Sequence, residues 1–190
     1  MRPMPTALIR PAVALCALGL CGNAQAQTCP ADGAAPAGTL LSVLLPERPV
    51  LRLNRAELDA LPRTELVSRR TVGGAGSAPA VEQQTRYTGW LLRDLLQRAQ
   101  GAGAAADHGQ RWVVFEAVAS DNYRAYFSWG ELFNSAAAEQ VLVIGSVDGL
   151  PLASDLGPLA LRALADLRPG PRHVRNLCAL VLRPMAGAAK

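Results

Sequence analysis

The sequence is poor in the residues from which enzyme sites are most often built. Aromatic residues make up 5% of the 190 residues, and there are two histidines and four cysteines. A nucleophilic triad needs an activated Ser or Cys beside a His, yet the chain has no G-x-S-x-G segment. A zinc site needs three or four clustered ligands, whereas neither His108 nor His173 has a paired ligand two to four residues away. No metal-ligating residue and no hydrolase chemistry are therefore predicted.

Charged residues are also few, at 18%, whereas half of the residues are hydrophobic. This composition excludes disorder as the general state, and the length suits one domain with its own core rather than two. The acidic residues stand singly, so solvated surface positions are expected for them. Glu116 differs, because it lies inside a hydrophobic segment.

Residues 1–26 have the features of a secretory signal peptide. Arg2 and Arg10 make the beginning positive, an apolar run follows, and Ala24-Gln25-Ala26 matches an A-x-A cleavage site. The mature chain is expected to begin at Gln27 and to be periplasmic or secreted.

Two alternatives remain for this segment. A membrane anchor needs about 20 apolar residues, and the run is well short of that. A lipid-modified Cys21 needs a small residue before it, whereas Leu20 stands there. No later segment is apolar for long enough to span a membrane, so no stable membrane insertion is expected after cleavage.

Cleavage changes both the charge and the cysteine count. Loss of the two signal-peptide arginines lowers the formal net charge from +4 to +2, so the basic composition predicts no nucleic-acid partner. Cys16 and Cys21 are also removed, which leaves Cys29 and Cys178. An even pair of cysteines in an oxidising compartment predicts a disulfide; the alternative is two unrelated buried thiols.

Short strands and short helices are mixed along the mature chain. Strands are expected at 40–45, 50–53, 65–72, in the run before Tyr87, and at 112–119, 123–127, 141–144, 159–164 and 177–182. Helices are expected from Asn54 to Pro62, from Trp90 to Gln100, and at 129–137. The lack of regular alternation favours an α+β fold with a mixed, largely β core. The expected organisation is an irregular N-terminal arm (27–38), one domain (39–184) and a tail (185–190).

Local signals support the helices. Asn54 with Glu57, and Ser128 with Glu131, have the spacing of capping boxes, and the leucines between Trp90 and Gln100 fall on one helical face. The following residues are expected to be mostly buried: Trp90, Leu91, Leu95, Leu96, Val114, Tyr123, Phe127, Leu132, Val143 and Leu159.

Two loops are candidates for binding an anion. Residues 73–77 are rich in glycine, but no helix follows at once, so a hairpin loop is preferred to a phosphate cradle. Pro169-Gly170-Pro171 fixes a second loop, which Arg168, Arg172, His173 and Arg175 flank. Paired guanidinium groups hold anions well, so Arg172, His173 and Arg175 are the candidate anion site. The alternative is a solvated basic loop.

Two groups of segments occur in a fixed order. The first is Leu58-Asp59-Ala60-Leu61-Pro62, followed by Tyr87-Thr88-Gly89-Trp90-Leu91-Leu92-Arg93-Asp94-Leu95-Leu96. The second is Ala119-Ser120-Asp121-Asn122-Tyr123-Arg124-Ala125-Tyr126-Phe127-Ser128, continued by Asp148-Gly149-Leu150-Pro151-Leu152 and Gly157-Pro158-Leu159. Together they resemble the molybdopterin-binding domain of the sulfite oxidase family in its small stand-alone bacterial form. The resemblance runs from about Leu51 to the C-terminus and implies a mixed α/β architecture around a largely β core.

In enzymes of this family, a pyranopterin dithiolene and one protein cysteine hold molybdenum, because a soft anionic sulfur suits that metal. The resemblance places that cysteine just after the strand that ends near Val72. Arg69-Arg70-Thr71-Val72-Gly73-Gly74 stands there, and no cysteine occurs between Cys29 and Cys178. The family's Tyr-Pro pair after Gly-Pro-Leu is also absent.

Two functions are consistent with these departures. The first is an exported domain of sulfite oxidase-like fold that has lost molybdenum catalysis. Such a pseudoenzyme would be a binding or accessory module for a protein or small-molecule partner in the cell envelope, and no cofactor is expected in it. The alternative is a molybdopterin-dependent oxidoreductase with an atypical metal site. Molybdenum content and pterin fluorescence of the purified protein distinguish the two.

The signal-peptide assignment predicts the mass of the exported protein. Intact-mass analysis of the secreted form is expected to give a chain that begins at Gln27. A mass that retains residues 1–26 would contradict the assignment.

Overall fold

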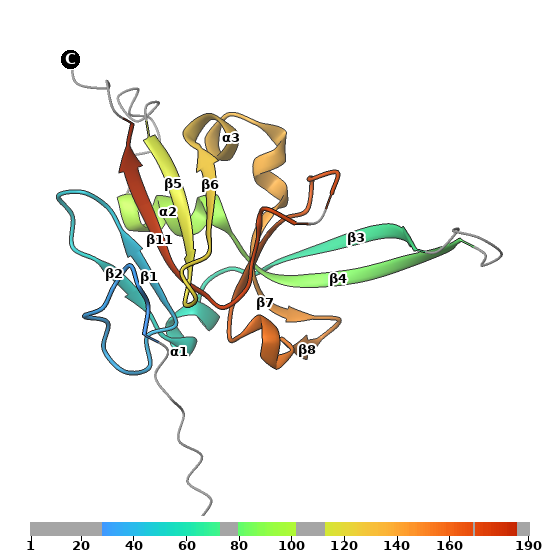
Figure 1. Cartoon of the computed structure of the whole chain (residues 1–190), viewed down its shortest axis with the longest axis horizontal. Helices are drawn as coiled ribbons and strands as arrows, with labels where there is room; N and C mark the ends of the chain where they lie inside the picture. The colour runs from blue at the N-terminus through green and yellow to red at the C-terminus, as the bar shows by residue number, and fades with distance from the viewer. Residues whose placement is uncertain (1–27, 73–79, 102–112, 169, 186–190) are drawn as a thin grey trace, which may run out of the picture.

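The computed structural model describes residues 28–72, 80–101, 113–168 and 170–185. The predicted signal peptide, the glycine-rich stretch at 73–77, His108 and most of the C-terminal tail lie outside the described residues. Within the described part of the chain, strands form two sheets and the helices are short (Figure 1). This architecture confirms the expected α+β fold class with a largely β core.

The first sheet has five strands and brings the two ends of the domain together. Its order is β2 (Leu51–Leu53), β1 (Leu41–Leu44), β11 (Leu177–Pro184), β5 (Val113–Ala119) and β6 (Arg124–Ser128). β1 pairs with β11 in parallel, while the other pairs are antiparallel. The sheet is therefore mixed, as the sequence predicted.

The second sheet carries most of the remaining strands. Its order is β10 (His173–Val174), β9 (Ala160–Ala163), β7 (Val141–Val147), β4 (Val81–Leu91) and β3 (Thr64–Val72), and β8 (Leu150–Pro151) pairs with β7. All these pairs are antiparallel. β3 and β4 form a long hairpin that projects away from the rest of the molecule (Figure 1).

The helical elements are α1 (Arg55–Asp59), α2 (Leu92–Gln100), α3 (Trp129–Phe133) and the 3-10 turns η3 (Ala136–Gln140) and η4 (Ser154–Leu156). The capping box of α1 is present in full, since Asn54 accepts the backbone N–H of Glu57 and the Glu57 carboxylate accepts the N–H of Asn54. At α3 only half of the predicted box forms. Ser128 accepts the N–H of Glu131 at 3.1 Å, but the Glu131 carboxylate pairs with Arg172 instead.

One hydrophobic core joins both sheets and the helices. It contains Leu41 and Phe115 from the first sheet, Trp90 and Val143 from the second, and Leu95 from α2, all nearly inaccessible to solvent. A smaller cluster lies on the opposite face of the second sheet, because residues next to core residues in β4 and β7 point the other way. Its buried members are Tyr87, Leu91, Leu142 and Ile144.

Most of the predicted burial is confirmed, and the bounds of all three predicted helices differ. The helix predicted from Asn54 to Pro62 ends at Asp59. Val114 is only half-buried, and Tyr123 is 43% exposed because its hydroxyl donates to the carbonyl of Pro171 at the surface. The helix predicted from Trp90 begins at Leu92, since Trp90 and Leu91 complete β4. The helix predicted at 129–137 is α3 followed by the separate turn η3.

Gly89 and Gly157, both in the segments that resemble the sulfite oxidase family, permit close approaches of the backbone. A Cβ at Gly89 would lie 1.9 Å from the carbonyl oxygen of Val143, at an irregularity in the β4–β7 pairing. Gly157 has a φ of +73°, and a Cβ there would meet the side chain of Asn176. Side chains at these two positions would displace the neighbouring strand or turn.

Residues 28–40 lie against the outer face of the first sheet, where a disulfide fixes them. Cys29 and Cys178 are bonded, with Cα atoms 5.7 Å apart, which confirms the predicted pair. The buried Asp32 carboxylate accepts two hydrogen bonds from Arg52 of β2. Hydrogen bonding from Arg52 is the largest influence and holds the pKa of Asp32 below its ordinary value despite burial. The N-terminal segment is thus attached by a covalent bond and an ion pair.

In the described ranges, no helix is both long and apolar enough to cross a membrane.

The core position of Leu95 predicts a large effect of truncation. Leu95 is 2% exposed, and removing a packed leucine side chain typically costs about 2–5 kcal/mol of unfolding free energy. Leu167, which is fully exposed, is the matched control, and Leu167→Ala is expected to change stability by less than about 0.5 kcal/mol. Denaturant unfolding measures both variants. Equal small effects would show that the buried face of α2 is assigned wrongly.

Candidate anion-binding site

The basic loop predicted from the sequence separates into two parts in the structure. Arg172 is paired at both ends of its guanidinium, with Asp166 and with Glu131, and lies 5.1 Å from the centre of the Phe127 ring. The hydrogen bond to Asp166 is the main reason that the pKa of Arg172 lies above its ordinary value. With two carboxylates around it, Arg172 joins β6, α3 and the loop before β10. It has no free charge to offer an anion.

His173 faces away from this ion pair, on the outer face of the second sheet. It stands opposite Arg162 in the β10–β9 pairing. The next residues, Val174 and Leu161, are both buried in the main core. Because neighbours in a strand alternate between faces, His173 and Arg162 point together to the face that carries Tyr87.

Arg162 is half-buried and has a neutral partner. Its guanidinium donates to the hydroxyl of Tyr87 and lies 5.1 Å from the centre of that ring. No carboxylate pairs with Arg162 among the described residues. Burial is the largest influence on this group and lowers the pKa of Arg162, and the nearby charge of Arg70 lowers it further.

Two further arginines complete a cluster. Arg70 lies on β3 on the same face as Tyr87, because Leu66 pairs directly with Tyr87 and residues 66, 68 and 70 alternate with the other face. Arg175 follows β10 and forms an exposed ion pair with Asp155 at 3.1 Å. The name basic cluster is used below for Arg70, Arg162, His173 and Arg175.

Burial and the positive charges of the basic cluster both lower the pKa of His173. Burial is the largest cause and lowers the pKa of His173 to about 4, and the positive charges of Arg162, Arg175 and Arg70 act in the same direction. Asp155 opposes them. Three guanidinium groups therefore act on a neutral imidazole, and the carboxylate of Asp155 opposes their effect on its pKa.

Two members of the basic cluster are not in the predicted loop. Arg162 and Arg70 lie on strands far away in sequence, and only the pairing of β9 with β10 and the placement of β3 bring them to His173. A signal was present, since Arg162 stands alone inside the apolar segment 159–164. A charged residue at an alternating position of such a strand indicates a specific environment on that face.

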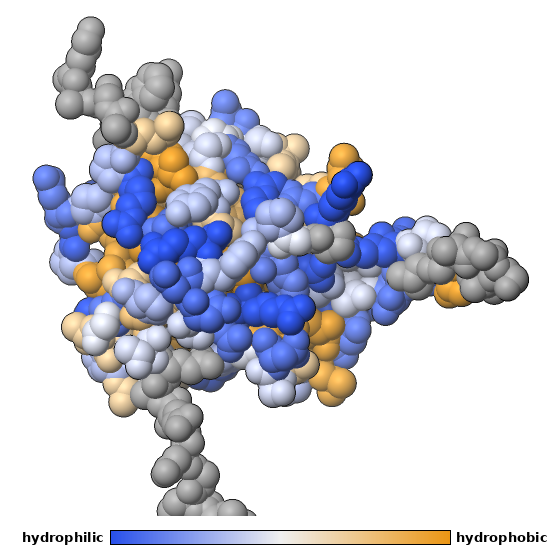
Figure 2. All heavy atoms as spheres, viewed as in Figure 1, coloured by the Kyte–Doolittle hydropathy of each residue, from blue (hydrophilic) through white to orange (hydrophobic). Residues whose placement is uncertain are grey.

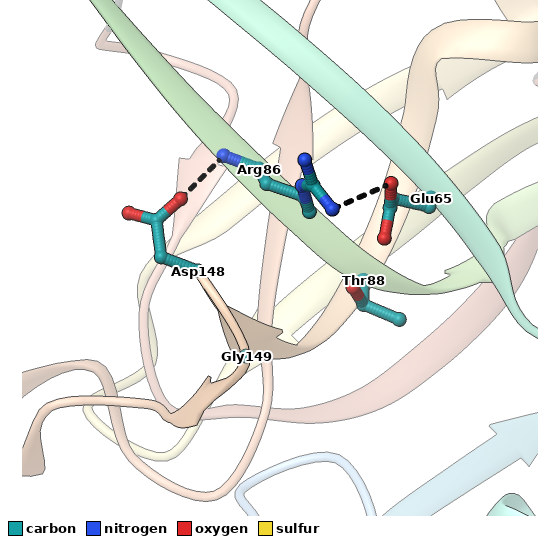
Figure 3. A pocket seen from close by; sticks show the side chains of 5 residues that line it. All are labelled: Glu65, Arg86, Thr88, Asp148 and Gly149. Carbon is teal, nitrogen blue, oxygen red and sulfur yellow. Dashed lines mark hydrogen bonds and ion pairs between the residues drawn. The ribbon is translucent and has the colours of Figure 1, made fainter.

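A polar pocket of about 390 Å³ lies where β3 and β4 meet the turn between β7 and β8 (Figure 3). Arg86 approaches Glu65 at 3.5 Å. The backbone N–H of Arg86 donates to Asp148 at 2.8 Å, while the N–H of Asp148 donates to the Arg86 carbonyl. Asp148 thereby fixes its turn to β4. The charged groups here compensate one another, so the pocket is a weaker candidate than the basic cluster.

Glu116, which the sequence distinguished, is the centre of a structural ion network. It is 3% exposed and accepts hydrogen bonds from Arg124 at 2.7 Å, Tyr126 at 3.0 Å and Arg183 at 3.0 Å. Burial raises the pKa of Glu116, but these three donors together lower it below its ordinary value. The carboxylate holds β5, β6 and β11 together and is not available as a general acid.

The residues present do not fit the molybdenum of the sulfite oxidase family. Cys29 and Cys178 are joined in a disulfide on the first sheet, so neither supplies a thiolate, and the end of β3 has no cysteine. The described ranges also contain no group of three or more His, Cys, Asp or Glu residues that suits a metal ion. No chemical step is therefore derived through this metal.

No protein-family model and no curated protein matches the chain. Among solved structures, the chain is similar to the sulfane dehydrogenase SoxCD from Paracoccus pantotrophus, with a TM-score of 0.54 and 16% sequence identity. The match covers 78% of this chain and 39% of that chain, so the protein spans about two-fifths of the length of that relative. At this identity the similarity shows the fold alone, and it supports the sulfite oxidase-like fold expected from the sequence.

The surroundings of His173 predict its titration. The ring signals of His173 in NMR spectra are expected to shift near pH 4 rather than near 6.5, and a His108→Gln variant assigns the signals. Arg162→Gln is expected to raise the pKa of His173, whereas Arg98→Gln on α2 leaves it unchanged. Because the unfolded chain binds more protons between these two pH values, the unfolding free energy falls as pH drops through that range. Titration near 6.5 in the unaltered protein would contradict the described cluster.

Proposed function

We propose that the protein is an exported binding module of sulfite oxidase-like fold that has no molybdenum catalysis of its own. Its ligand is a small oxyanion, bound at the basic cluster on the outer face of the second sheet. Its partners, a small molecule or a protein that carries such a group, are expected in the cell envelope. The predicted signal peptide and the disulfide support this location, because disulfides persist in oxidising compartments.

The observation that carries the proposal is the uncompensated charge of Arg162. Buried charges are normally paired, since desolvation of an unpaired ion is costly. Arg162 instead has the phenol of Tyr87, and Arg70 and Arg175 add positive charge nearby. A bound anion would supply the missing negative charge.

Arg172 provides an internal comparison. It lies in the neighbouring loop with similar partial burial, and two carboxylates neutralise it. Among the residues that the structure describes, the arginine with a structural role is thus paired with carboxylates, whereas Arg162 is not. This contrast is expected of a site that receives its negative charge from a ligand.

The chemistry of the donors indicates the class of ligand. Guanidinium groups present planar pairs of N–H donors that match the oxygens of phosphate, sulfate or carboxylate. The hydroxyl of Tyr87 and the neutral ring of His173 add donors that carry no charge. Inorganic phosphate and sulfate are therefore suitable first probes.

The fold likeness to SoxCD favours one other function, an oxidoreductase that binds molybdopterin at an atypical site. The paired cysteines oppose it, because no thiolate of the mature chain is left for the metal. Elemental analysis of protein purified from its native compartment distinguishes the two functions. Stoichiometric molybdenum would overturn the proposal that the module has no molybdenum catalysis.

The proposed site predicts a specific loss of anion binding. Isothermal titration calorimetry of the mature protein with phosphate and with sulfate is expected to show binding at neutral pH. Loss of a charged hydrogen-bond donor typically costs about 1.5–3 kcal/mol, so Arg162→Gln is expected to weaken binding by roughly tenfold or more.

Arg98→Gln is the matched control, because Arg98 is an exposed arginine on α2, outside the basic cluster. This variant is expected to bind like the unaltered protein. Equal binding by both variants, or no binding by the unaltered protein, would contradict the site.

A further inference from the structure

The hairpin of β3 and β4 leaves a long strand at the edge of the second sheet. β3 has nine residues, all paired with β4 on one side, and it is the last strand in the sheet order. Within the described ranges, no strand pairs with its other side. Such an edge presents backbone donors and acceptors that can pair with another strand.

One face of this hairpin carries mostly exposed side chains. Glu65, Val67 and Arg69 on β3, and Glu82 and Arg86 on β4, are all exposed side chains. Val67, a large apolar residue in the middle of the edge strand, is 49% exposed. The space-filling view shows the hairpin projecting to one side of the main body of the molecule (Figure 2).

The shape of the hairpin also favours an additional strand. It projects from the body as a two-stranded ribbon (Figure 1). Isolated two-stranded hairpins are at best marginally stable in water, whereas three or more strands stabilise one another. The outer part of β3 would therefore gain support from a neighbour.

We propose that the edge of β3 is a dimer interface at which two copies of this chain pair antiparallel, centred on Val67. The two hairpins then form one four-stranded ribbon between the two domains. The occupant is a second copy because the sequence of β3 is complementary to itself in one register, as a two-fold interface requires.

The charges of β3 select this register. A two-fold axis perpendicular to the sheet pairs residues of the same face, so the axis passes midway between one residue and its own copy. Centring on Val67 places Val67 opposite Val67 of the second copy. It also places Glu65 of each copy opposite Arg69 of the other, which gives two ion pairs. Centring on Leu66 places Arg63 opposite Arg69, and centring on Arg69 places arginine opposite arginine. Centring on Ser68 gives no ion pair.

The favoured register also extends ion pairs that already exist. Arg69 lies 3.9 Å from Glu82 of β4, and Glu65 lies 3.5 Å from Arg86. Pairing at Val67 makes a row of alternating charges across four strands: Glu82, Arg69, then Glu65 and Arg86 of the second copy. Opposite charges on facing strands stabilise a sheet, and like charges destabilise it.

Two paired strands bury less area than a standard protein interface, so the dimer is expected to depend on concentration. Sedimentation equilibrium of the mature protein is expected to show a monomer–dimer equilibrium. Glu65→Arg and Arg69→Glu each place like charges opposite one another and are expected to weaken dimerisation by tenfold or more. The double variant E65R/R69E restores opposite charges and is expected to recover dimerisation.

Glu139→Arg is the matched control, because Glu139 has a similar exposure, 57% against 51% for Glu65, and also pairs with an arginine of its own chain. It is expected to dimerise like the unaltered protein, and circular dichroism checks that every variant is folded. Hydrogen exchange gives an independent measurement, since the β3 amides on the open edge become protected in the dimer. A monomer at all concentrations, or single variants that dimerise normally, would overturn the proposal. A double variant that stays monomeric while folded would also overturn it.

Discussion

The pairing of β4 with β7 at Gly89 is the constraint on which both faces of the second sheet depend. The carbonyl of Val143 approaches Gly89 so closely that a Cβ would lie 1.9 Å from it, and the pairing is irregular at this point. On one side of the irregularity Trp90 enters the main core, where it contacts the strand at Gly145. On the other side Tyr87 points to the opposite face and receives Arg162. Because β4 continues directly into α2, the same contact also sets where the leucines of that helix enter the core.

The distribution of compensated charge distinguishes structural ion pairs from the proposed binding site. Asp32, Glu116 and Arg172 are buried or half-buried groups, and each has one or more partners of opposite charge on another element. These pairs hold the N-terminal segment, three strands of the first sheet, and the loop before β10. Arg162 is the contrasting case, because its partner among the described residues is a phenol and Arg70 adds positive charge nearby. A charge that folding leaves uncompensated lowers stability, and an anionic ligand would remove that cost.

The disulfide links the fold to the proposed loss of catalysis. It joins the first described residues to the last strand of the first sheet and buries both cysteines. The same bond removes the two cysteines that lie outside the predicted signal peptide from any role as a soft metal ligand. Likeness of fold to a much longer enzyme therefore does not carry that enzyme's chemistry to this chain, because function depends on the groups at the site.

The sequence by itself determined the features that depend on neighbouring residues and on counting. Local hydrogen bonding sets the cap at Asn54, and alternation and apolar runs set most of the strands. The two cysteines outside the predicted signal peptide allow one intramolecular pair. Tertiary structure decided what depends on long-range pairing. The sequence placed Arg172 in the anion site because it flanks the Pro-Gly-Pro loop, but Asp166 and Glu131, from the loop and from α3, neutralise it. Arg162 and Arg70 lie near His173 only because of strand pairing. The periodicity of side chains within one segment does not predict which strands pair. Trp90 and Leu91 also fit the helical pattern of the residues that follow. They lie in β4 nevertheless, because they pair with strand β7.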